Sequence, residues 1–516
     1  MDFIILLPIL IPLLAGVVLY FVKRLTTAKA LGIYSAVVAA LALFAMLFAG
    51  SMGDLSLRVL NMFDGLSIYF HIDGMSKLFG VLGAGLWCLT AIYSIAYFKG
   101  EQRLRRYFLF YQFALGVIMA LCLAGNIITF YMCFEMMTLL TFPFVLQEQT
   151  KEAVFGAFKY LLFSVCGAMT ALAGIFFLCR YTEGMDFAVG GIIDVKAAFG
   201  HQQLILVAVM LTIVGFGAKA GMFPLHAWLP VAHPVAPAPA SAILSGFIAK
   251  CGVLAIVRMV FYVVGPDWIR ETWVQYTWMI LSLMTVFMGS MLAYREKVLK
   301  KRLAYSTVSQ ISYILFGLSL LNDFGVTGGL LHVVYHACVK VVLFLFAGVV
   351  IHQTGKTKVA DLDGLGKRMP ITYVCFTLVS VTLVGIPPTS AFMSKLYLCI
   401  GALQTGMPVI YYTGIAILLI SALLTAGYLL SITVKGFYYD EKPVAEETLN
   451  EDGTAKLLEE TLHEDGTVKE SDKSGSLEPG ACMLVPMILL TILAVGLGVF
   501  TKPFMDYIVP LAAELL

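Results

Sequence analysis

The sequence predicts an all-α membrane protein that crosses the bilayer about fourteen times. Of its 516 residues, 60% are hydrophobic and only 13% are charged, whereas a soluble domain carries about a quarter charged residues. The mean hydropathy of +0.91 agrees with this. The third observation is a succession of apolar stretches of about 20 residues, the length that crosses a hydrocarbon core. The sequence contains no basic tract of the kind that binds nucleic acids, so no nucleic-acid partner is expected.

The predicted spans follow one another with short polar connections. They lie at 3–22, 29–50, 75–98, 107–124, 127–147, 153–179, 203–220, 237–260, 273–293, 303–321, 327–351, 371–400, 409–434 and 481–500. The first span lacks a preceding basic stretch and an obvious cleavage site, so we expect it to be retained rather than removed as a signal peptide.

The distribution of lysine and arginine between the loops predicts the orientation. Loops that follow odd-numbered spans hold 22 of the 34 lysines and arginines, and loops on the other side hold 7. Positively charged loops face the cytoplasm. We therefore expect a multi-pass protein of the cell (inner, cytoplasmic) membrane with both termini on the outer side.

The ten cysteines are scattered singly, without any Cys-x-x-Cys pair. Iron–sulfur and structural zinc sites use paired cysteines, so neither is expected in this chain. The sequence also shows no nucleotide-binding loop and no flavin motif. We expect no cofactor in this chain, and the energy that drives any transport must then come from other subunits.

One long polar segment, at about 437–480, interrupts the membrane pattern. It contains a tandem duplication of a 13-residue unit, EETLNEDGTAKLL followed by EETLHEDGTVKES. The segment is acidic, lacks aromatic residues over the repeats and cannot bury a core. It is either a tolerated loop expansion or a cytoplasmic docking segment for a partner subunit.

Six charged residues lie inside segments that should otherwise be hydrocarbon. They are Glu135, Lys159, Lys219, Lys250, Lys340 and Lys395. A charge at the bilayer centre costs about 2.5–3.5 kcal/mol on insertion scales, so such residues usually serve transport. Lys159 is the exception, because it lies near the cytoplasmic end of its span and can extend to the interface.

Two of these lysines border predicted helix breaks. Five prolines lie between Pro224 and Pro239, just after Lys219, and Gly385-Ile386-Pro387-Pro388 precedes Lys395. Proline removes a backbone donor and kinks or ends a helix. Interrupted spans at corresponding positions of two halves indicate an inverted-repeat transporter. Water should reach these breaks, because the freed backbone groups need partners.

At these residues the chain resembles the antiporter-like membrane subunits of respiratory complex I, membrane-bound hydrogenases and Mrp Na⁺/H⁺ antiporters. The resemblance covers about 100–435 and rests on several motifs in order. They are FYMCFEMMTL (130–139), GAKAGMFPLHAWLPVAH (217–233), SAILSGFIAKCGVLAIVR (241–258), KRLAYSTVSQISYI (301–314), HVVYHACVKVVLFLFAG (332–348) and GIPPTSAFMSK (385–395). The chain is most similar to the D-type Mrp or hydrogenase-associated form, since it ends soon after the last span, without the long lateral helix of the most distal complex I subunit.

The resemblance implies two inverted five-helix repeats with discontinuous helices 7 and 12. The implied regions are 1–100 (helices 1–3), 101–260 (first repeat, helices 4–8), 270–436 (second repeat, helices 9–13), 437–480 (acidic loop) and 481–516 (helix 14). It also implies other membrane subunits as partners, including homologous antiporter-like subunits, and H⁺ or Na⁺ as the transported ion.

The charged residues suggest a relay that runs Glu135–Lys219–Lys250–His332/His336–Lys395. Burial disfavours the charged form of a carboxylate or a lysine, whereas a pair of the two stabilises both. An ion pair between Glu135 and Lys219 that opens reversibly could therefore gate proton release. Lys250 fits a site between the halves, and Lys395 fits the terminal exchange site. Structural salt bridges or lysines that extend to the interface are the alternatives.

Histidines supply further candidates. His332, His336 and Lys340 fall at i, i+4 and i+8, on one helical face. We expect proton transfer there rather than metal binding, because a third ligand is missing and Lys340 would repel a cation; a packed polar stripe is the alternative. Two pairs are second-tier candidates. His226 and His233 could line a cytoplasmic inlet or be loop histidines with satisfied hydrogen bonds, and Tyr305 and Ser309 could hold water or join helices.

The predicted function is translocation of protons, alone or in exchange for Na⁺, by one subunit of a larger energy-converting complex. An Mrp-type antiporter without redox chemistry is the alternative, as is a self-contained secondary transporter. A third possibility is a scaffold or quinone-pocket subunit without a conducting path, but the buried charges argue against it.

Overall fold

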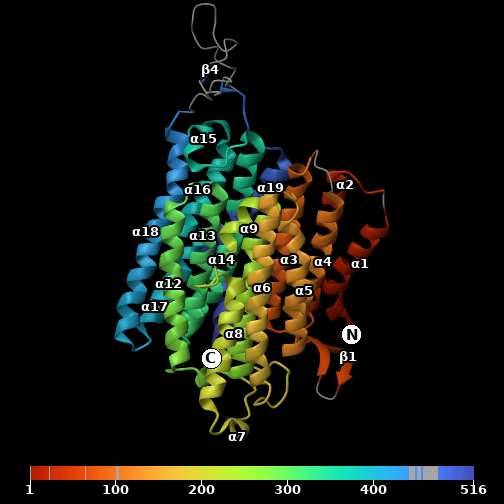
Figure 1. Cartoon of the computed structure of the whole chain (residues 1–516), viewed down its shortest axis with the longest axis vertical. Coiled ribbons are helices and arrows are strands. Elements are labelled where there is room, and N and C mark those ends of the chain that lie inside the picture. The colour runs from red at the N-terminus through yellow and green to blue at the C-terminus, as the bar shows by residue number, and fades with distance from the viewer. Residues whose placement is uncertain are drawn as a thin grey trace, which may run out of the picture.

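The computed structural model describes residues 2–22, 24–63, 66–99, 104–440 and 475–516, together with two short strands. The helices lie side by side in one bundle, as Figure 1 shows. The strands β3 (Thr448–Leu449) and β4 (Ala455–Lys456) pair antiparallel within the first copy of the acidic repeat. The rest of the 13-residue duplication lies outside the described residues.

The chain begins with three long helices and a hairpin. These elements are η1 (Asp2–Leu6), α1 (Leu7–Phe21), α2 (Ala28–Ser51), β1 (Ser56–Phe63), β2 (Leu66–His71) and α3 (Gly74–Tyr97). The strands pair antiparallel, with Ser56 opposite His71. This hairpin was not predicted from the sequence; it lies in the loop between the second and third predicted spans.

The next part corresponds to the predicted helices 4–8. Its elements are α4 (Leu104–Leu123), α5 (Ile127–Val145), α6 (Lys151–Leu178), α7 (Val195–Ala198), α8 (Gln202–Ala220), α9 (Leu229–Val235), α10 (Ala238–Ile243), η2 (Leu244–Ile248), α11 (Ala249–Val257), η3 (Arg258–Val264) and η4 (Pro266–Trp268). The elements from α10 to η3 form one continuous span in which η2 and η3 are π-helical.

The remaining elements correspond to the predicted helices 9–14. They are α12 (Trp273–Arg295), α13 (Leu299–Ser319), α14 (Asp323–Thr354), η5 (Val359–Asp361), α15 (Leu365–Arg368), α16 (Pro370–Val384), α17 (Ser390–Leu403), α18 (Pro408–Tyr438), α19 (Ala481–Val499) and α20 (Lys502–Glu514). The α14 helix is almost wholly buried at the centre of the bundle.

The described residues contain twelve helices that are long and apolar enough to cross a membrane. Two predicted spans complete the fourteen. One is α13, whose first turn carries Lys300, Lys301 and Arg302, and the other is the pair α16 and α17, each of which is short on its own. The all-α polytopic fold is therefore confirmed, and the predicted interruption of helix 12 is observed.

Capping side chains explain where several helices begin. A polar side chain at the first residue of a helix can accept a hydrogen bond from a free backbone N–H. Asp73 accepts from Ser76 N at 2.7 Å before α3, Asn126 from Thr129 N at 2.8 Å before α5, and Asn322 from Gly325 N at 2.8 Å before α14. Short polar residues therefore define these boundaries.

Both termini lie toward the end of the bundle that carries β1 and α7, opposite α15 (Figure 1). An even number of spans requires this arrangement. Two predictions are not tested by the structure. One is that this end of the bundle faces the outside, and the other is that the regions divide at residues 100, 260, 436 and 480.

Candidate functional site

The first predicted break lies between α8 and α9. The α8 helix ends at Gly221, whose φ of +81° is a left-handed conformation that glycine adopts without strain. The break leaves carbonyl groups without helical partners. Trp228, just before α9, donates its indole N–H to the carbonyl oxygen of Ala218 at 2.9 Å. The indole thus satisfies a carbonyl group at the broken end of α8, on the residue next to Lys219.

Lys219 is buried in a cradle of hydroxyl groups. Its Nζ donates to Tyr160 OH at 2.6 Å, to Thr138 Oγ1 at 2.9 Å and to Ser164 Oγ at 3.3 Å. These partners come from α5 and α6, and they match the three N–H donors of an ammonium group. Only 1% of the Lys219 surface is exposed.

Glu135 does not form the expected direct ion pair with Lys219. Its Oε1 instead accepts a hydrogen bond from Tyr131 OH at 3.0 Å, and the residue is half-buried. Thr138, one turn further along α5, binds Lys219 in its place. Hydroxyls of α5 and α6 thus bind the ammonium in this structure, and the reversible pairing of Glu135 with Lys219 stays a prediction. Glu135 lies about one helical turn before Thr138 on α5, so the carboxylate belongs to the same helix as one of the ammonium's partners.

Lys250 lies directly after the π-helical turn η2. Its Nζ donates to the carbonyl oxygen of Ser245 at 2.7 Å, and Ser245 Oγ contacts Thr307 Oγ1 at 2.6 Å. A π-helical turn places carbonyls out of the α-helical register and is frequent at functional sites. In this chain the turn brings a backbone oxygen to a fully buried ammonium.

Lys340 joins the same polar cluster from α14. Its Nζ donates to Ser306 Oγ at 2.7 Å and to the carbonyl oxygen of Leu303 at 3.1 Å. Thr307 Oγ1 donates to the same carbonyl at 3.0 Å. Lys250 and Lys340 are thus joined through Ser245, Thr307 and Leu303. Carbonyl oxygens cannot pass on a proton, so these contacts position the lysines, and transfer between them needs water.

His332 and His336 stack on one face of α14, as their spacing predicts. Their ring centroids are 5.8 Å apart, with an angle of 12° between the planes. His332 Nδ1 contacts Ser394 Oγ at 2.9 Å, and Nε2 contacts Gln310 Oε1 at 3.1 Å. Both ring nitrogens of His336 are buried without a partner among the described residues. Ordered water commonly satisfies such groups.

The second break lies between α16 and α17 and resembles the first. The α16 helix ends at Gly385, with φ +88°. Lys395 Nζ donates to the carbonyl oxygens of Leu383 at 2.7 Å and Val384 at 2.8 Å. A cation at a helix C-terminus is favoured by the helix dipole. Lys395 thus donates to the free carbonyl groups at this helix end, as Trp228 does at the first break.

Tyr313 connects Lys395 to the histidine pair. Lys395 Nζ lies 5.2 Å from the centre of the Tyr313 ring, which stacks on His332 at 5.5 Å. Lys395, His332 and His336 therefore belong to one cluster, which continues along α14 toward Lys340 and Lys250. The Lys219 cradle forms a second cluster. The α11 helix connects the two, since Gly252 packs against Lys219 close to Lys250.

The second-tier candidates lie in different places. His233 is buried and stacks on Phe344 at 4.7 Å, and its two ring nitrogens have no hydrogen-bond partner in the described structure. His226 is half-buried beside the ring of Phe223. Ser309 contacts Ser290 at 2.8 Å and Ser421 at 3.4 Å, so it joins α13 to α12 and α18.

Two side chains lie away from these clusters. Tyr305 is half-buried and packs at the edge of the core. Lys159 is half-buried, and its Nζ is 6.0 Å from the Phe155 ring on the same helix. Lys159 therefore fits the alternative of a lysine that extends to the membrane interface.

Sequence reasoning missed a buried ion pair. Arg258, at the start of η3, donates to both carboxylate oxygens of Asp73, the cap of α3, and to Ser76 Oγ at 3.1 Å. Burial alone would raise the pKa of Asp73, but Arg258 and the hydrogen bonds from Ser76 hold it well below its usual value. The partners are 185 residues apart, and Arg258 lies near the end of the predicted span 237–260 without a carboxylate close to it in the sequence.

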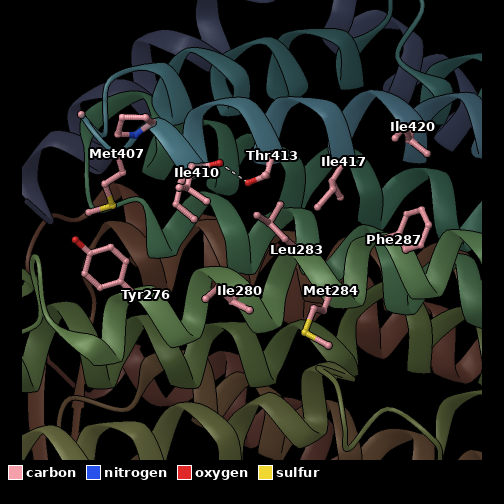
Figure 2. Close-up of a pocket in the computed structure, with 13 residues that line it drawn as sticks. Tyr276, Ile280, Leu283, Met284, Phe287, Met407, Ile410, Thr413, Ile417 and Ile420 are labelled. Carbon is pink, nitrogen blue, oxygen red and sulfur yellow. Dashed lines mark hydrogen bonds between the residues drawn. The ribbon is translucent and has the colours of Figure 1, made fainter.

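A groove between α12 and α18 contributes nothing to these clusters. Figure 2 shows its walls, with Ile280, Met284 and Phe287 on one side and Ile417 and Ile420 on the other. Its volume is about 810 Å³. The groove is lined by apolar residues apart from two hydroxyls, and no charged residue lines it. It therefore has no features of an ion site.

No group of three or more histidine, cysteine, aspartate or glutamate side chains in the described part of the chain is arranged to hold a metal ion. The clusters are built from lysines, histidines, hydroxyls and carbonyl oxygens. They can hold and exchange protons or bind water.

Comparison with known proteins identifies the family. A family model described as the transmembrane region of NADH:quinone oxidoreductase and Mrp antiporter subunits matches residues 124–425, more than half of the chain. The chain belongs to this family. The resemblance seen in the motifs is thereby confirmed, and the chain is an antiporter-like membrane subunit.

Individual relatives agree with this assignment. The NADH-quinone oxidoreductase subunit N of Desulforudis audaxviator is 27% identical over 86% of this chain and 87% of its own length. The Na⁺/H⁺ antiporter subunit A1 of Staphylococcus aureus is 28% identical over 66% of this chain, but the match spans only 44% of that longer protein. A chain of the Mrp complex from Dietzia sp. DQ12-45-1b has the same fold, with a TM-score of 0.82 at 23% identity over 100% of this chain and 97% of that chain.

Proposed function

We propose that this subunit moves protons across the membrane along Glu135, Lys219, Lys250, His332, His336 and Lys395, with Lys340 beside the central part. One observation carries the proposal. Lys250 and Lys340 are fully buried, and within the described structure their ammonium groups bond only to neutral oxygens. A structural lysine is normally paired with a carboxylate when buried, so these two are best explained by exchange of a proton.

The geometry supports a relay of short steps with water between them. The hydroxyl cradle can hold Lys219 in its charged form, and Glu135, one turn before Thr138 on α5, can take up or return a proton. The unpartnered ring nitrogens of His336 and His233 offer places for water on the way to Lys250 and the inlet. The two nitrogens of an imidazole ring can act one as acceptor and one as donor, so each ring can pass a proton in either direction.

We also propose that the chain works with other membrane subunits, including homologous ones, because its sequence shows no nucleotide-binding loop or flavin motif and it has the fold of a chain of the Mrp complex. Two kinds of assembly fit. A redox-driven complex is suggested by the subunit N relative, and an antiporter that exchanges H⁺ for Na⁺ is suggested by the subunit A1 relative and the Mrp structure. The cell membrane, with both termini outside, is the proposed location.

The test is transport by the intact complex in liposomes, with pH and Na⁺ gradients followed by separate dyes. We expect the wild type to form a pH gradient and His336→Gln to slow it by about tenfold or more, because an amide cannot accept and release a proton as an imidazole can. Ser309→Ala is the control, since it removes a hydroxyl that joins helices, and it should transport normally. An undiminished rate in His336→Gln would remove this histidine from the path.

A further inference from the structure

A second pocket opens on the side of the bundle, away from the polar clusters. It lies between α2, α3, α14, α19 and α20 and has a volume of about 520 Å³, within the range of cavities that bind ligands. Leucines from α2, α3 and α19 form most of its lining. Such a pocket within a membrane-spanning bundle suits an alkyl chain rather than a polar solute.

One cation lines this otherwise apolar pocket. Lys77, in the first turn of α3, lies at the end of the bundle that carries the termini, and it is half-buried. Its stem lies along Gly50 at the end of α2. The Lys77 ammonium has no ion-pair partner among the described residues. The nearby carboxylate of Asp73 is already paired with Arg258. The pocket therefore combines an apolar interior with a free positive charge at the level of the headgroups.

We propose that this lateral pocket binds an anionic phospholipid, with one acyl chain between α3 and α19 and the phosphate on Lys77. Charge complementarity selects this occupant, since a lysine near the membrane surface attracts anionic headgroups, whereas the positive group of a zwitterionic headgroup offsets the charge of its phosphate. Tyr507 of α20 stands at the same opening, fixed by a hydrogen bond to the carbonyl oxygen of Gly74 at 2.8 Å.

The inner wall of the pocket belongs to the central helix. Val334 and Cys338 of α14 line it, and they alternate along that helix with His332, His336 and Lys340. A bound acyl chain would pack directly on the helix that carries these groups. The proposal does not depend on proton transport, because the binding site is defined by the pocket and Lys77 alone.

Gly85 of α3 allows a sharp test. It lines the pocket, and a Cβ added there would meet no atom within 4 Å, so Gly85→Leu should fill the pocket without disturbing the helix. Gly496 of α19 also faces open space but does not line the pocket, so Gly496→Leu is the matched control. Lys77→Gln removes the charge, with Lys502→Gln of α20 as its control.

The experiment is native mass spectrometry of the intact complex, delipidated and then titrated with phosphatidylglycerol or phosphatidylcholine. We expect phosphatidylglycerol to bind about fivefold more tightly, the ratio that one lysine near an anionic surface supplies, and Lys77→Gln to abolish the preference. Gly85→Leu should remove one bound lipid, whereas both controls retain it. Equal binding of the two lipids, or an unchanged lipid count in Gly85→Leu, would overturn the proposal. Loss of a partner subunit from Gly85→Leu with lipid retained would mean that a protein helix fills the pocket instead.

Discussion

Replacing Lys219 with alanine is expected to lower proton movement through the complex by about a hundredfold or more, because a positioned acid or base contributes that much to a proton transfer. Alanine removes the only ammonium group in the cradle of Thr138, Tyr160 and Ser164. The three hydroxyls can still bond to one another or to water, so the complex should assemble. The measurement is the rate of acidification in liposomes, with the amount of assembled complex as the reference.

A second variant at this position distinguishes a proton carrier from a structural charge. Arginine keeps the positive charge but does not release its proton in proteins. If Lys219 exchanges a proton, Lys219→Arg should be as inactive as Lys219→Ala. If only the charge matters, Lys219→Arg should retain transport. Lys159→Ala is the control, since Lys159 is a half-buried lysine on α6 outside the cradle. Persistence of both gradients in Lys219→Ala would show that the path assigned to this chain is wrong.

The two breaks explain why so much of the candidate site could be predicted from the sequence. Gly221 and Gly385, with the prolines that follow them, are local signals, and a lysine in an apolar span is conspicuous in any context. Periodicity alone likewise places His332 and His336 on one face of α14. These features depend on neighbours within a few residues, so the order of the residues is sufficient to reveal them.

The partners of the charges could not be predicted in the same way. Tyr160 and Ser164 bind Lys219 from a different helix, and hydroxyl residues are common enough in spans to carry no signal of their own. No sequence signal therefore indicated that hydroxyl groups, rather than Glu135, contact the Lys219 ammonium directly. The contact between Lys250 and Ser245 depends on a π-helical turn, which no periodicity in the sequence marks.

Breaking the Asp73–Arg258 pair is expected to cause the largest loss of stability of any single change considered. Arg258 is 2% exposed and Asp73 18% exposed, so removing either partner leaves a buried charge without compensation, at a cost of about 3–5 kcal/mol. Asp73→Asn should lower the thermal unfolding midpoint, measured by tryptophan fluorescence in detergent. The double variant Asp73→Asn/Arg258→Met should recover part of the loss, because no charge is then buried alone.

Acidity provides an independent measure of the same pair. Because the folded-state pKa of Asp73 lies below its usual value, its contribution is fully present above the unfolded-state pKa of about 3.9 and is lost as the pH falls through the folded-state value. The stability difference between wild type and Asp73→Asn should therefore stay constant from about pH 5 to pH 8 and shrink only in stronger acid. A difference that already disappears near pH 6 would contradict the ion pair, as would a single variant as stable as the wild type.

Since Asp73 caps α3 and Arg258 begins η3, the pair connects the N-terminal helices to the span that carries Lys250. Its loss should for this reason also loosen the position of Lys250.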